Sequence, residues 1–157
     1  MLRRAIAVIA PVLALTLAPP LAQAATTQHA LKLTIRDSTI SSQGDRPGNR
    51  QTTAGLVSGN PIGHGVESIS DKVTSATSAT ITLKGTIAIY TTHGIMTGTI
   101  DIHVTPTSNG GATATGNGKI TGGSGRYTRA HGKFAFTGGE SPNSSVFVSH
   151  VTGTLSF

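Results

Sequence analysis

The chain of 157 residues contains no cysteine, so disulfides, thiol nucleophiles and cysteine-ligated zinc are all excluded. It also lacks tryptophan and has only four phenylalanines and two tyrosines. Nucleic-acid-binding proteins commonly combine a basic stripe with stacking aromatic side chains. Here the formal net charge is +6, but the lysines and arginines are scattered singly. We therefore predict no nucleic-acid partner.

Familiar catalytic and cofactor motifs are missing as well. The sequence has no Gly-x-Ser-x-Gly elbow and no Gly-Lys-Ser/Thr phosphate loop. Its six acidic residues are widely spread and form no evident glycosidase pair. Its six histidines never occur at the short spacing that is typical of a zinc site. We predict neither a metal nor a cofactor.

The first 24 residues have the layout of a secretory signal peptide. Arg3 and Arg4 precede an apolar run from Ala5 to Leu17, and Ala22-Gln23-Ala24 fits a small-x-small cleavage site. The run is shorter than the roughly 20 residues that a membrane span needs. We expect cleavage near Ala24, a secreted or extracytoplasmic protein without a membrane span, and one domain over residues 25–157.

Alternation of apolar and polar residues dominates the rest of the chain. Residues 31–36 and 81–89 alternate in this way, and Met96, Ile100, Ile102 and Val104 share one strand face. No segment after the leader has helical periodicity. Seven or eight strands at this spacing indicate an all-β sandwich or antiparallel barrel. We favour the barrel, because closure removes the exposed edges that promote aggregation.

A glycine-rich corner at residues 118–132 is the most informative segment. Gly122, Gly123 and Gly125 lie close together between two alternating stretches. Glycine tolerates positive φ, so such a cluster predicts a tight and irregular reversal between strands.

This corner resembles the corresponding segment of the allene oxide cyclase and dirigent superfamily. The matching residues are Ile120-Thr-Gly-Gly-Ser-Gly-Arg-Tyr127 with Ala130-His131-Gly132. Three further segments are similar to family elements: Gly44-Asp45, Ile62-Gly-His-Gly65 and Leu83-Lys-Gly-Thr-Ile87. Together the resemblance covers roughly residues 30–157.

The resemblance implies an eight-stranded antiparallel β-barrel, often a homotrimer, with an apolar pocket at one end. Plant members cyclise an unstable fatty-acid epoxide or steer the coupling of phenoxy radicals. Asp45 corresponds to the acidic group that the cyclases keep in the pocket. Dirigent proteins typically have Ala-Arg-Gly where this chain has Ala130-His131-Gly132.

Each candidate site residue has a functional and a structural interpretation. Asp101 and His103 project from one strand face, where they could act as acid and base or simply form a polar outer face. Asp45 could flank a pocket mouth or belong to an ordinary turn. The remaining candidates are His131 for catalysis and, for ligand binding, His103 together with Tyr90, Arg126 and Tyr127.

Three functions are open from the sequence. The first is a pocket that binds or steers a small lipophilic or phenolic molecule, chiefly by orienting it. The second is a non-catalytic module whose outer face binds a partner or a cell-surface polymer. The third is an isomerase that uses Asp45, Asp101 or His131 as acid or base.

Overall fold

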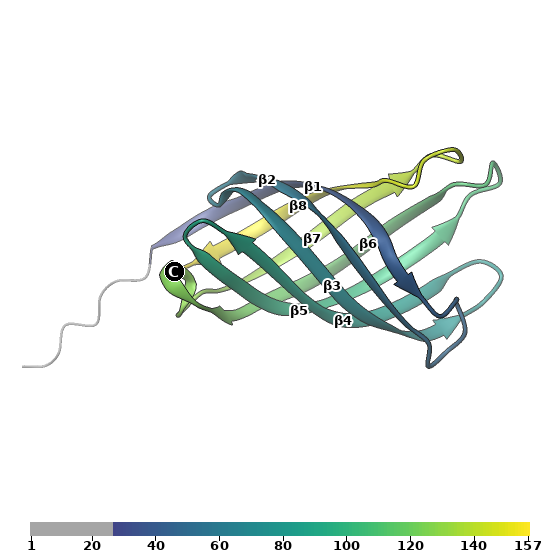
Figure 1. Cartoon of the computed structure of the whole chain (residues 1–157), viewed down its shortest axis with the longest axis horizontal. Helices are drawn as coiled ribbons and strands as arrows, with labels where there is room; N and C mark the ends of the chain where they lie inside the picture. The colour runs from purple at the N-terminus through teal and green to yellow at the C-terminus, as the bar shows by residue number, and fades with distance from the viewer. Residues whose placement is uncertain (1–26) are drawn as a thin grey trace, which may run out of the picture.

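A computed structural model describes residues 27–157, and the expected signal peptide therefore lies outside the described residues. Eight antiparallel strands form one closed barrel in which each strand pairs with its sequence neighbours and β8 closes onto β1 (Figure 1). The expected all-β, eight-stranded antiparallel barrel is confirmed. The strands are β1 (Gln28–Ser42), β2 (Arg50–Asn60), β3 (Gly63–Ala76), β4 (Ile81–Thr91), β5 (Gly94–Pro106), β6 (Ala112–Gly123), β7 (His131–Glu140) and β8 (Phe147–Ser156).

The predicted alternation determines which side chains are inside. Leu31, Leu33 and Ile35 of β1 are buried, whereas Lys32 and Arg36 between them are exposed. Successive side chains of a strand point to opposite faces, so one apolar set per strand suffices to fill a barrel. The apolar residues of all eight strands meet in a single interior cluster, to which β2 contributes only Val57.

The glycine-rich corner closes one end of the barrel. It forms a 3-10 turn, η1 (Gly125–Tyr127), between β6 and β7, close to the C-terminus (Figure 1). Gly125 has a φ of +59°, as expected for an irregular reversal. The Ser124 amide donates to Ile95 O at 2.8 Å and the Arg126 amide donates to His93 O at 2.9 Å. The turn is thereby attached to the β4–β5 hairpin.

Tyr127 seals this end from within. Its side chain is fully buried, and its ring meets the Phe157 ring edge-on with 5.2 Å between the centroids. Ile62 and Ala130 are buried beside the same core. We call this end of the molecule the closed end.

The β1–β2, β3–β4, β5–β6 and β7–β8 loops surround the opposite end (Figure 1). Residues 27–157 contain no helix that is long and apolar enough to cross a bilayer.

Several glycines lie beneath aromatic rings of the interior. A Cβ on Gly118 would come within 2.3 Å of Phe134 Cζ, and a Cβ on Gly116 within 2.4 Å of Phe136 Cε1. Both phenyl rings therefore lie close against the bare backbone of β6. This arrangement keeps the rings close to the wall and leaves space along the barrel axis.

Candidate functional site

A cavity of about 650 Å³ occupies the barrel interior. Loop residues at the end opposite η1 contribute to its lining, including Asp45 of the β1–β2 loop and Ser145 of the β7–β8 loop. We call that end the mouth. A volume of this size is within the range of small-molecule sites.

The cavity has two chemically different walls. Strands β4 to β6 contribute only apolar side chains, whereas β7 contributes Phe134 and Phe136 together with Glu140 at its mouth end. Strands β1 to β3 contribute polar ones as well, among them Gln51 and Thr53. The apolar wall residues of β4 to β6 are Ile81, Leu83, Ile87, Ile89, Met96, Ile100, Ile102, Val104, Pro106, Ala112, Ala114 and Ile120.

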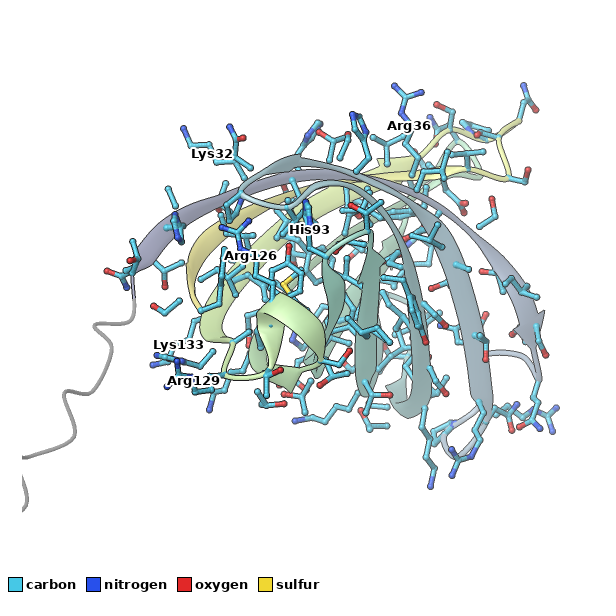
Figure 2. All side chains as sticks on the ribbon, turned by 60° about the vertical axis from the view of Figure 1, so that its left-hand side comes forward. Lys32, Arg36, His93, Arg126, Arg129 and Lys133 are labelled. Atoms are coloured by element: carbon cyan, nitrogen blue, oxygen red, sulfur yellow. The ribbon has the colours of Figure 1, made fainter. Side chains whose placement is uncertain are left out.

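Charge is strongly segregated between the cavity and the outer surface. Of the six acidic residues in the chain, all except Asp101 line the cavity: Asp37, Asp45, Glu67, Asp71 and Glu140. Within residues 27–157, no lysine, arginine or histidine lines it. Figure 2 shows Lys32, Arg36, Arg129 and Lys133 pointing away from the barrel. The basic residues therefore form an outer shell around an acidic interior.

Glu67 is the most deeply buried of the acidic groups. Its exposed fraction is 0 %, and neither carboxylate oxygen has a hydrogen-bond partner of good geometry among the described residues. Burial, and to a lesser degree the neighbouring Asp37 carboxyl, raise the pKa of Glu67 to about 9. Desolvation disfavours the charged form of a carboxyl group, and a second carboxylate nearby has the same effect. Without a bound counter-charge, Glu67 is therefore protonated at neutral pH.

Asp37 and Glu67 flank Gly55 across three strands. Gly55 of β2 pairs with Asp37 of β1 on one side and with Glu67 of β3 on the other. Because Gly55 has no side chain, nothing on β2 separates the two carboxyl groups. The pKa of Asp37 is also raised, mainly by burial, while the side-chain interaction with the Glu67 carboxyl group lowers this pKa in part.

Asp71 lies four residues after Glu67 on β3, closer to the mouth. Its exposed fraction is 3 %, and its Oδ1 has no hydrogen-bond partner within the described part of the chain. Burial raises the pKa of Asp71 to about 6, and the side chain of Gln51, directly across the β2–β3 ladder, lowers it in part. Gly85 lies opposite Asp71 on β4, so bare backbone also flanks this carboxyl group.

Of the predicted site residues, only Asp45 lines the cavity, at the mouth. Asp101 lies outside it and pairs with Lys84 at 3.4 Å. His103 is exposed on the same outer face, with its Nδ1 3.3 Å from Thr82 Oγ1. The structural interpretation of this pair, a polar outer face, is the one that matches their positions.

The other four predicted residues lie on the outside or at the closed end. Tyr90 is 47 % exposed on the outer face of β4. Arg126 is stacked over the Phe157 ring, with 4.7 Å between its Cζ and the ring centroid. Tyr127 is buried at the closed end but does not line the cavity, and His131 is exposed. The structure does not bring these residues together with Asp45.

The cavity-lining acids Asp37, Glu67 and Asp71 were not among the predicted site residues, although the sequence contains a signal for them. Asp37 continues the inward series of Leu31, Leu33 and Ile35 at period two. Glu67 and Asp71 alternate with Ile69 on the inward face of β3. An acidic residue in phase with a buried apolar series is the pattern that would have identified them.

No protein-family model matches this sequence, and no curated protein sequence is significantly similar to it. Within the described residues, no group of three or more histidine, aspartate and glutamate side chains is placed to hold a metal ion.

Proposed function

We propose that this protein is a small-molecule-binding barrel that holds a lipophilic or phenolic ligand in its interior, as a dirigent- or cyclase-like protein does. The observation that carries the proposal is the cavity of about 650 Å³, with one apolar wall and a few buried polar groups. Such a combination of apolar lining and convergent polar groups is typical of ligand sites. The expected leader would place this activity outside the cytoplasm.

The proposed action is orientation of the ligand rather than covalent chemistry. The polar side of the cavity, which carries Asp37, Glu67 and Asp71 on β1 and β3, is called the acidic wall. A flexible molecule held between the apolar wall and the acidic wall would be restricted to few conformers. Orientation alone can lower a reaction barrier by roughly 7–11 kcal/mol in favourable cases. A protonated Glu67 could in addition donate a hydrogen bond to a developing negative charge on the ligand.

The test is binding of Nile red, a neutral dye that becomes fluorescent in apolar surroundings. We expect saturable binding of one dye per barrel and a rise in Tm. The variant Ala114→Trp places a large side chain on the apolar wall, since Ala114 lines the cavity on β6. We expect this variant to lose most of the dye binding while it remains folded.

Ala88→Trp is the matched control, because Ala88 lies between the inward-facing Ile87 and Ile89 and does not line the cavity. It should bind the dye as the wild type does. Absence of saturable binding to the folded wild type, or equal loss in both variants, would contradict the proposal.

A second candidate function uses the outer face. Leu56 of β2, Val66 of β3 and Tyr90 of β4 are exposed and pair across adjacent strands in one apolar row. Rows of this kind often mark contact surfaces. If the row binds a partner or a further copy of the chain, Leu56→Ser with Tyr90→Ser should abolish retention on that partner or lower the oligomeric state in sedimentation. Dye binding in the cavity should be unchanged.

A further inference from the structure

Two buried carboxyl groups of the cavity lining have no basic side chain beside them in the described part of the chain. Glu67 is fully buried with both oxygens unpartnered, and Asp71 is 97 % buried with an unpartnered Oδ1. Burying an ionised carboxylate without a partner is costly, and proteins normally pair such groups. No cationic side chain of residues 27–157 lines the cavity to do so.

The neighbouring backbone keeps this wall open toward the cavity. Gly55 separates Asp37 from Glu67 across the sheet, and Gly85 flanks Asp71. A Cβ on Gly55 would come within 2.5 Å of Asp37 Cβ, and a Cβ on Gly85 within 2.6 Å of Asp71 Cβ. Side chains at either glycine would therefore occupy the space beside the carboxyl groups.

The remaining lining limits which ligand could meet these groups. An anionic ligand such as a fatty-acid carboxylate would face five acidic residues and no base, which is repulsive. A bare metal ion would gain nothing from the apolar wall, and no group of three potential ligands is placed for one in residues 27–157. An organic cation with an apolar body would satisfy both walls.

We propose that the cavity selects a lipophilic amine or quaternary ammonium compound, with its cationic head beside Glu67 and Asp71 and its apolar body against the wall formed by β4 to β6. This inference rests on the proposed function, because it names the chemical class of the ligand. Its head would be held by charge and its body by burial of apolar surface.

The test compares three probes that share a ten-carbon chain: decyltrimethylammonium, decanol and decanoate. Each probe is added as a competitor to the wild-type protein loaded with Nile red, at pH 7.5 and below the micelle concentration of that probe. We expect decyltrimethylammonium to displace the dye at a concentration at least tenfold lower than decanol, and decanoate to be the weakest. The head group of the ammonium probe does not titrate, so its charge is fixed.

The variant Glu67→Gln/Asp71→Asn keeps the shape of the wall and removes the two buried carboxyl groups beside which the cationic head is proposed to lie. We expect the preference for decyltrimethylammonium over decanol to fall below threefold, while displacement by decanol stays unchanged. Asp101→Asn removes an acidic group from the outer face and should leave the preference as in the wild type. If the double variant fails to fold, the order in which the three probes displace the dye from the wild type still tests whether the cavity selects cations.

The outcomes separate this inference from the proposed function. If decanol or decanoate displaces the dye as well as the ammonium probe does, the cavity binds ligands but does not select cations, and the inference is overturned. The inference is also overturned if the Glu67→Gln/Asp71→Asn variant keeps the preference for the ammonium probe. If Nile red itself does not bind, the proposed function fails first.

Discussion

Gly55 lies directly opposite Asp37 in the β1–β2 ladder, and the two backbones leave no room for a side chain on the glycine. A Cβ there would be 2.4 Å from Arg36 O and 2.5 Å from Asp37 Cα. We therefore expect Gly55→Ala to lower the free energy of unfolding by about 2 kcal/mol or more, because the strands must separate to accept the methyl group. Thermal unfolding would show a Tm roughly 5–10 °C lower.

Gly122→Ala is the matched control for this substitution. Nothing lies within 4 Å of a Cβ on Gly122, and its φ is not in the left-handed region. Its Tm should stay within about 2 °C of the wild type. Equal effects of the two alanines would show that glycine matters here for chain flexibility rather than for close approach to Asp37.

The raised pKa of Glu67 predicts a pH-dependent stability. The pKa of Glu67 is about 9 in the folded protein, whereas an ordinary glutamate has a pKa of 4.5. The folded state therefore retains a proton that the unfolded state releases. Stability from this group is complete below pH 4.5 and is lost as the pH rises toward 9. We expect the free energy of unfolding to fall by roughly 1–3 kcal/mol between pH 5 and pH 8.

Glu67→Gln should remove most of that slope, since its amide does not titrate. Denaturant unfolding at pH 5, 6.5 and 8 would measure it. Asp71, whose pKa is raised to about 6, adds a smaller decrease in stability between pH 4 and pH 6 that remains in the variant. A slope between pH 6.5 and pH 8 that is the same in wild type and variant would refute the assignment.

The Tyr127 hydroxyl is buried and has no hydrogen-bond partner within residues 27–157. We expect Tyr127→Phe to be neutral or to raise the free energy of unfolding by up to about 1 kcal/mol, because an unsatisfied polar group is removed. Tyr127→Ala should instead destabilise the barrel by about 3–5 kcal/mol, since the closed end loses its largest side chain. Chemical denaturation measures both; a large loss in Tyr127→Phe would mean that the hydroxyl is bonded in solution.

The ion pair between Lys84 and Asp101 is exposed on the outer face, with side-chain exposed fractions of 62 % and 42 %. Exposed pairs of this kind contribute about 0–1 kcal/mol. We expect Asp101→Asn to change stability by less than about 1 kcal/mol and to leave Nile red binding unaltered. Loss of dye binding in this variant would place Asp101 in the function after all.

The barrel could be predicted from the sequence because its strands and turns are encoded by patterns of neighbouring residues. Alternation at residues 31–36 and 81–89 and the glycine-rich corner at 118–132 all correspond to features of the structure. The corner was informative because three glycines close together between two alternating stretches predict a chain reversal. The spacing of the strands predicted seven or eight of them and favoured closure, the resemblance implied eight, and the observed topology is a closed barrel of eight strands.

The site was harder to predict because it depends on long-range register. Asp37 and Glu67 are thirty residues apart, and only the pairing of both with Gly55 brings them together. Histidines and tyrosines were predicted as site residues because their side chains are chemically reactive, yet Tyr90 and His131 are exposed on the outside of the barrel. That Gly116 and Gly118 accommodate the phenyl rings of Phe136 and Phe134 likewise follows only from the pairing of β6 with β7.

The division between a basic shell and an acidic lining has a practical consequence for anyone handling the protein. A chromatography resin or a neighbouring macromolecule meets the exposed lysines and arginines of the outer surface. A molecule that has entered through the mouth meets the opposite polarity. Screening libraries chosen to suit a cationic protein would therefore be rich in acids. Such compounds would complement the outer surface and not the cavity.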